Sequence, residues 1–195
     1  MPSKTKVIAG KPKIGGAIFR APYGTPLPTD AMTPLDKAFK ELGYASSDGW
    51  SRKITKAFNT INAWGGDEIN KSRTELSLGI DTTLVEELNG DTQEAKWGTA
   101  SVTQTDATAD HGNLITVAYD GSDDLDPYVW VFDMAEGRRL HRSVFMNAVD
   151  TTESFEQTFS DSDIISLPFS LSVYRDDATG LFFYDYLDDG KVLKA

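Results

Sequence analysis

The chain has 195 residues, no cysteine and a formal net charge of −11 at pH 7. The missing cysteines exclude a disulfide framework, thiolate metal sites and a cysteine nucleophile. The negative charge argues against general nucleic-acid binding, which depends on lysines and arginines that neutralise phosphates. No apolar run approaches the ~18 residues of a membrane span, and the first residues lack the apolar segment of a signal peptide. We therefore expect a soluble, unexported protein with no membrane partner.

The charge is unevenly distributed. Residues 1–20 carry five basic residues and no acid, whereas residues 106–136 carry eight acids and no lysine or arginine. Residues 1–13 have no usable periodicity, so we expect an extended arm in front of one domain at residues 14–195. The asymmetry can serve solubility alone, or the arm can dock on the acidic surface of another copy. On the second interpretation the arm residues at the inter-subunit contact are Lys4, Lys6, Val7, Ile8, Lys11 and Lys13.

The first predicted elements are a strand at residues 15–21 and a stiff, ordered connection at residues 22–34 that contains four prolines. A helix is predicted next, over residues 34–42. Thr33 stands at its N-cap position, Pro34 at its first position and Gly43 after its end. An apolar face on this helix would cover one side of a sheet.

Residues 45–70 predict a long hairpin, because aromatic residues and glycines are scattered among Ser, Asn and Lys. Exposed aromatic side chains usually mark a contact with another molecule. The alternative, local packing in the core, stays open for this segment. The predicted contact residues are Trp50, Phe58, Trp64, Gly65 and Gly66.

The middle of the chain predicts a half-buried strand at residues 74–80 and a short helical turn at residues 83–88, before Asn89 and Gly90. Further strands are predicted from the composition and alternation of the residues that follow. They lie at residues 98–105, 114–119, 128–134 and 139–149, the last two forming a hairpin. Residues 154–159 lead into a final hairpin.

That final hairpin covers residues 163–187. Apolar residues alternate with small polar ones from Ile165 to Val173, which is the period of a half-buried strand. Its polar side, formed by Ser166, Ser170 and Ser172, is a candidate lining of a sheet face or of a lumen. Pro168 cannot donate to a ladder, and we interpret it as an edge position. Roughly ten strands and one flanking helix predict a mainly β fold, an antiparallel β-sandwich or barrel.

No pattern in the sequence predicts catalysis or a cofactor. The glycines near Gly16 lack the Lys and Ser/Thr of a phosphate loop, and the alternating acids of residues 120–126 lack the turning glycine and closing glutamate of a calcium loop. His111 and His141 have no ligand or triad spacing, and Glu86 and Glu87 diverge on a helix. We therefore expect no enzyme activity, no metal and no cofactor.

The segment GAIFRAPYGTPLPTDA at residues 16–31 resembles major tail tube proteins of long-tailed, non-contractile bacteriophages, nearest in pattern to those of actinobacterial phages. The resemblance continues at Leu35-Asp36, Ala38-Phe39, Leu42-Gly43-Tyr44, Ser47-Asp48-Gly49, Trp64-Gly65-Gly66-Asp67 and residues 176–180.

The resemblance implies a structural virion protein made in the host cytoplasm and located in the virion tail. Six copies would join their inner sheets into a ring, and the rings would stack as a tube for DNA ejection. Implied partners are further copies of the chain, then the tape measure, tail terminator and tail tip proteins, with double-stranded DNA only in transit. Two alternatives remain: another virion β-sandwich, such as a head decoration or receptor-binding protein, and a β-barrel that binds or hydrolyses a small molecule.

Overall fold

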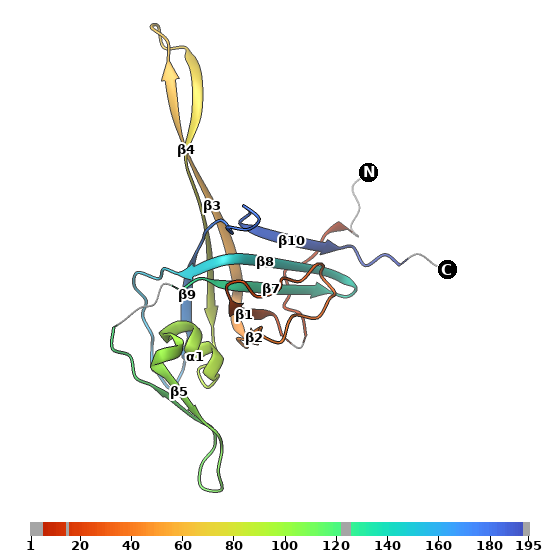
Figure 1. The fold of residues 1–195 in the computed structure, drawn as a ribbon, viewed down its shortest axis with the longest axis vertical. Helices are drawn as coiled ribbons and strands as arrows, with labels where there is room; N and C mark the ends of the chain where they lie inside the picture. The colour runs from red at the N-terminus through yellow and green to blue at the C-terminus, as the bar shows by residue number, and fades with distance from the viewer. Residues whose placement is uncertain (1–5, 15, 122–125, 193–195) are drawn as a thin grey trace.

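The computed structural model describes residues 6–14, 16–121 and 126–192. Its fold is mainly β, with antiparallel strand pairs and, in these residues, one short α-helix (Figure 1). This confirms the predicted fold class. The elements are β1 Ile18–Pro22, β2 Lys40–Glu41, β3 Ala45–Asn62, β4 Glu68–Leu84, α1 Gly90–Trp97, η2 Thr99–Ser101, β5 Val102–Thr105, β6 Leu114–Val117, β7 Tyr128–Glu136, β8 Arg139–Asp150, β9 Leu167–Val173 and β10 Phe183–Asp188.

The main sheet runs in the order β2-β1-β7-β8-β9-β4-β3, and β10 also pairs with β8. Residues 140–145 of β8 pair with β10, whereas residues 148–150 pair with β9. Strand β8 therefore belongs to two layers of the fold. The first layer contains β1, β7 and β10, and the second contains β9, β4 and β3. A separate two-stranded ribbon, β5–β6, lies beside α1.

The core fills the space between these two layers. Leu167, Phe169, Leu171 and Val173 of β9 are buried and alternate with partly exposed residues, which confirms the predicted period. The ring of Phe169 meets that of Trp130 from β7 at 5.5 Å between centroids. Each fully buried side chain of this size contributes about 1.5–3 kcal/mol to folding, so the facing rows of apolar residues hold the layers together.

The predicted helix at residues 34–42 is wrong. Residues 36–39 form a single turn, residues 40–41 pair with β1, and the amide of Leu42 donates to Ile18 O. The backbone carbonyls of Asp30 and Thr33 accept hydrogen bonds from the buried guanidinium of Arg142. This segment is irregular chain held by these contacts, and its apolar side chains (Leu27, Leu35 and Phe39) pack against Val129, Val131 and Val144 of the first layer.

The α-helix instead begins where the sequence predicted a helical turn to end. Asn89 is the N-cap of α1, and its Oδ1 accepts hydrogen bonds from the amides of Asp91 and Thr92 at 3.0 and 3.4 Å. An Asn-Gly pair can end a helix or begin one. Here Asn89 and Gly90 begin α1, and Gly90 is buried where the side chain of Gln104 leaves no room for a Cβ atom. Residues 83–84 belong to β4, and residues 85–88 form the connection.

The predicted pairing of the last two strands with each other is also wrong. β9 pairs with β4 and β8, whereas β10 pairs with β8, and residues 154–159 form a loop. Alternation fixes which side chains are buried but does not name the partner strand. β9 is thus not an edge strand, yet Pro168 lies where only β4 pairs with it, and its carbonyl accepts a hydrogen bond from Lys96.

Candidate assembly surfaces

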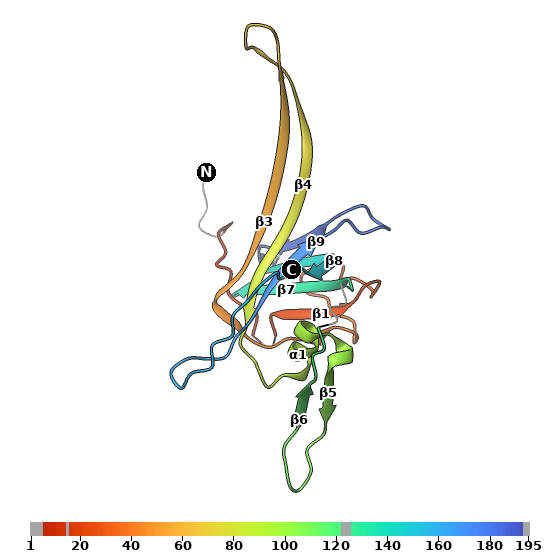
Figure 2. The same ribbon diagram turned by 90° about the vertical axis from the view of Figure 1, so that its left-hand side faces the viewer.

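The β3–β4 hairpin extends far beyond the body of the protein (Figures 1 and 2). A long hairpin was predicted here, but over residues 45–70 only; the strand predicted separately at residues 74–80 is the inner part of β4, so the hairpin runs to Leu84. At its base Arg52 pairs with Asp185 of β10 at 2.9 Å and lies 4.2 Å above the ring centroid of Phe183. Beyond the Ile54–Leu78 pair both strands are mostly exposed, and no other strand of the described chain pairs with them.

One side of the distal hairpin continues the core side of the second layer. Arg52 stands opposite the buried Ile80, and the next pairs on that side are Ile54 with Leu78 and Lys56 with Leu76. We call this side the hairpin apolar face. Its members outside the body are Ile54, Phe58 and Leu76, flanked by Lys56, Lys71 and Arg73. Ile54 and Phe58 are about half exposed, at 48% and 51%.

The tip of the hairpin presents an aromatic side chain to solvent. Trp64 is fully exposed, and it stands in a turn closed by hydrogen bonds from the amides of Ala63 and Gly66. Gly65 and Gly66 have φ of 116° and 97°, a region that residues with a Cβ rarely adopt. The predicted residues Trp64, Gly65 and Gly66 are therefore brought together, with Phe58 farther down the same hairpin.

Trp50 differs from the other residues predicted on this segment. Its ring stacks on Phe132 at 4.6 Å and meets Phe145 edge-on at 5.9 Å, so it packs against the core. The sequence interpretation also missed the exposed aliphatic side chains of the hairpin. They are Ile54, Ile61 and Ile69, isolated apolar residues among polar ones with no regular period to mark them in the sequence.

Two of the predicted serines, Ser170 and Ser172, lie on the solvent side of the second layer, whereas Ser166 precedes β9 and its carbonyl accepts a hydrogen bond from Gln157. Ser170 Oγ donates to Asp81 Oδ1 at 2.7 Å, and Ser172 stands opposite Gly79 and shares a hydrogen bond with Thr151. Ser51, Thr55 and Ser77 continue this surface onto the hairpin, with Lys53, Glu75 and Asp81 as its charged members. We call it the smooth polar face. It presents small side chains, and more carboxylates than cations.

The described part of the arm contacts its own chain. Pro12 bridges Met134, Lys13 N donates to Asp133 O, and Ala135 N donates to Lys11 O, so the arm continues the edge of β7 that β1 occupies. The side chains of Lys11 and Lys13 approach Glu136 and Asp133 at 3.9 and 3.7 Å.

Two further contacts hold the start of the described arm. Ala9 N donates to Glu136, and Arg139 donates to Val7 O. In the single chain, then, residues 6–13 do not use the acids of residues 147–190. Docking across a subunit boundary stays a prediction, and Lys4 lies outside the described residues.

The nearest approach to a catalytic constellation is Ser143, His141 and Asp185. Asp185 accepts a hydrogen bond directly from Ser143 Oγ at 2.6 Å, and His141 Nε2 faces both residues, at 3.3 and 3.5 Å. A triad needs the acid on the far nitrogen of the imidazole, so this is a structural network. Partial burial raises the pKa of Asp185, but hydrogen bonds from Ser143 and Arg52 outweigh it and hold that pKa below its usual range.

In the described ranges no cluster of His, Asp and Glu side chains has the geometry of a metal site. The acids of residues 122–125, considered above for calcium, lie outside those ranges. The helical segments that are described are too short or too polar to cross a lipid bilayer. The distinctive surfaces are thus the hairpin apolar face, the tip and the smooth polar face.

A scan of the chain against protein-family models finds no match, and a search of the curated proteins finds none either.

Proposed function

We propose that this chain is a tail tube protein of a long-tailed, non-contractile bacteriophage, and that it assembles into hexameric rings stacked as the conduit for DNA ejection. The observation that carries the proposal is the β3–β4 hairpin, whose core-type face runs on beyond the core. A solvated hairpin gains nothing from Ile54, Phe58 and Trp64, and exposed apolar patches of this kind mark contacts. The family resemblance at residues 16–49 supplies the identity of the partner as another copy.

The sheet edges support lateral assembly. In the described part of the chain no strand pairs with the outer edge of β3 or of β10. Open edges invite aggregation unless they are covered, and closure of a ring removes them. Such a ring forms when each copy contacts the next through two different surfaces and the rotation between neighbouring copies brings the last copy back to the first.

The smooth polar face suits the lining of the conduit. Duplex DNA binds where lysines and arginines neutralise its phosphates, and this surface is small, hydroxyl-rich and weakly acidic. The chain as a whole carries −11. Phosphates are therefore repelled, and the DNA can slide without being held. The tape measure, tail terminator and tail tip proteins are the further partners of such a tube.

Electron microscopy of the purified protein at rising concentration tests this function. A tube protein gives rings or striated tubes that sediment. A head decoration protein binds only assembled capsids, and a small-molecule barrel stays monomeric and gains thermal stability with its ligand. Monomers at all concentrations, with no rings, would overturn the proposal.

A further inference from the structure

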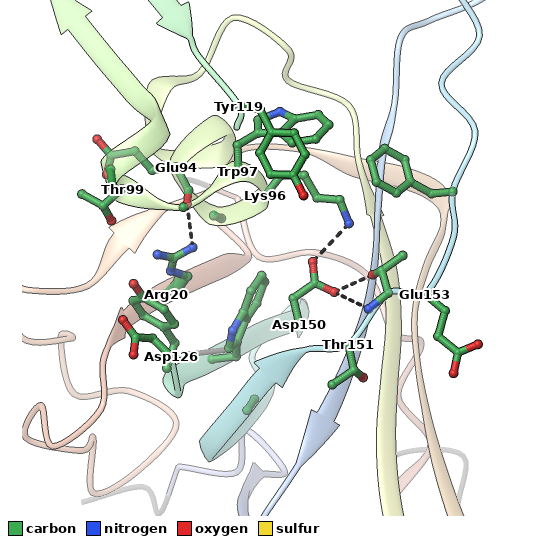
Figure 3. Close-up of a pocket in the computed structure, with 18 of the residues that line it drawn as sticks. Arg20, Glu94, Lys96, Trp97, Thr99, Tyr119, Asp126, Asp150, Thr151 and Glu153 are labelled. Carbon is green, nitrogen blue, oxygen red and sulfur yellow. Dashed lines mark hydrogen bonds and ion pairs between the residues drawn. The ribbon is translucent and has the colours of Figure 1, made fainter. Parts of the chain in front are cut away.

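A cleft of about 840 Å³ lies beneath α1, between the helix, the start of β7 and the segment that follows β8 (Figure 3). Lys96 of α1 contacts Asp150 at 3.1 Å and donates to Pro168 O at 2.7 Å. Arg20 of β1 donates to the backbone carbonyl of Glu94 at 3.3 Å. These contacts tie the helix to the main sheet, so the cleft belongs to the packing of the single chain.

A second hollow, of about 740 Å³, lies between the arm and the body. Residues 10–14 of the arm stand on one side of it. The other sides include apolar side chains of the body: Ile18, Trp50, Phe132 and Met134. The arm therefore spans an opening in the apolar packing of the body.

The arm is bound to the part of the β7 edge that β1 leaves free. β1 pairs with residues 128–132 of β7, whereas the arm has its hydrogen bonds at residues 133 and 135. We call residues 133–136 the arm seat. Pro12 faces Met134 and Ile18 faces Phe132, so six steps along the arm stand opposite two steps along β7. The chain between Pro12 and Ile18 thus carries slack, and six straightened residues span about 20 Å.

The arm is held loosely in its own seat. Residues 6–14 are all exposed or half-buried, and the apolar Val7 and Ile14 are 67% and 100% exposed. The ion pairs of Lys11 and Lys13 with the seat are long, at 3.9 and 3.7 Å. Segments with few buried apolar contacts open locally at a low free-energy cost. The arm should therefore leave its seat far more easily than a strand leaves the body.

We propose that in the assembled tube the arm of one copy occupies the arm seat of a neighbouring copy. This proposal rests on the proposed function and names the surface that receives the arm. Exchange keeps the contacts of the seat, because the same segment meets the same surface in both cases. It adds burial, since an arm that crosses from one copy to the next lies between them and takes Val7 and Ile14 out of water.

Backbone pairing supplies most of this contact. The acids of the seat also bind arginines of their own chain, Asp133 with Arg142 and Glu136 with Arg139, so the arm lysines are not their sole partners. A segment that adds to an open sheet edge gains its affinity from main-chain hydrogen bonds. In the monomer the arm covers its own seat, and its release precedes assembly.

Disulfide trapping tests the exchange, because the chain has no native cysteine. Pro12 and Met134 form an antiparallel bridge whose hydrogen bonds lie at the residues on either side. Cα atoms of such a pair are about 4.5 Å apart, within the range of a disulfide. Tubes made from a mixture of Pro12→Cys and Met134→Cys chains should give a reducible dimer under mild oxidant. Pro12→Cys mixed with Thr103→Cys, an exposed position on β5, should give none.

A double variant tests the release of the arm. Pro12→Cys/Met134→Cys, oxidised as a dilute monomer, locks the arm in its own seat. Its critical concentration for tubes should rise about tenfold or more, and a reductant should restore it. Lys11→Cys and Ala135→Cys, joined by the neighbouring backbone hydrogen bond, repeat both measurements if Met134→Cys impairs folding.

The outcomes separate the exchange from the tube function. A locked chain that assembles at the concentration of the parent, or mixed tubes without the dimer, would overturn the exchange and leave the tube function standing. An unmodified chain that forms no tubes overturns the tube function, and the exchange with it.

Discussion

Replacing Trp64 by Ala separates the fold of this protein from its assembly. Trp64 contacts solvent on all sides in the single chain, so the free energy of unfolding of the monomer should change by less than ~0.5 kcal/mol, as for surface substitutions in general. The matched control is Trp130→Ala. Trp130 is 2% exposed and packs on Phe169, and truncation of such a residue costs about 3–5 kcal/mol.

The assembly of the Trp64→Ala variant should change instead. A tryptophan buried at an interface covers roughly 150–250 Å². Truncation of an anchor of this kind costs on the order of 2–4 kcal/mol per contact, which raises the critical concentration roughly 30-fold or more. Urea denaturation of the monomer and sedimentation of tubes measure the two quantities. The reasoning is refuted if the monomer loses several kcal/mol, which would place Trp64 in the core, or if tubes form at the concentration that the parent chain needs.

Three further predictions concern the base of the hairpin, the arm and the conduit. Asp185→Asn should lower the stability at pH 7 by about 1–3 kcal/mol. The difference should be complete above about pH 4 and should shrink in urea titrations as the pH falls from the unfolded pKa of about 3.9 through the lower folded pKa, because protonation of the carboxyl removes its charged contacts; a difference that is as large at about pH 2 as at pH 7 would argue against the network. Deleting residues 1–13 should abolish tubes while the β circular-dichroism spectrum is kept, and Gln in place of the four arm lysines should slow polymerisation mainly at low salt; normal rates from the truncated chain would make the arm a passive tail. Assembled tubes should not retain duplex DNA in filter binding, and tight binding that weakens steeply with salt would contradict an acidic lining.

The elements that follow from local alternation were predictable. Burial in β9 obeys the period of two, and the β7–β8 and β3–β4 hairpins have the sequence signals of their turns. The helix at residues 34–42 failed because backbone groups at its end and just before its start have tertiary partners. Arg142 takes the carbonyls of Asp30 and Thr33, and Ile18 takes the amide of Leu42. None of these long-range contacts is visible in a window of ten residues.

The assembly surfaces were predictable in part for a related reason. The turn residues around Trp64 predicted that its side chain is exposed. Trp50 has similar neighbours in the sequence, yet its ring packs on Phe132. The difference depends on where the hairpin leaves the body, at the Arg52–Asp185 pair, which joins residues 133 positions apart. The cleft beneath α1 was not foreseen, since its walls come from five separate stretches of the chain, at residues 20, 94–100, 119, 126–130 and 148–155.

The sharing of β8 between the two layers has a consequence for local opening. Its residues 140–145 are bonded on both sides, to β7 and to β10, so these amides should exchange with solvent hydrogen only when the whole domain opens. Beyond the Ile54–Leu78 pair no described strand flanks the hairpin, so its amides can exchange by fraying from the tip. The body of the protein should therefore exchange its amides only on global unfolding, whereas the hairpin exchanges its amides by local unfolding. Docking of the hairpin on a neighbouring copy would raise the protection of its amides to that of the body.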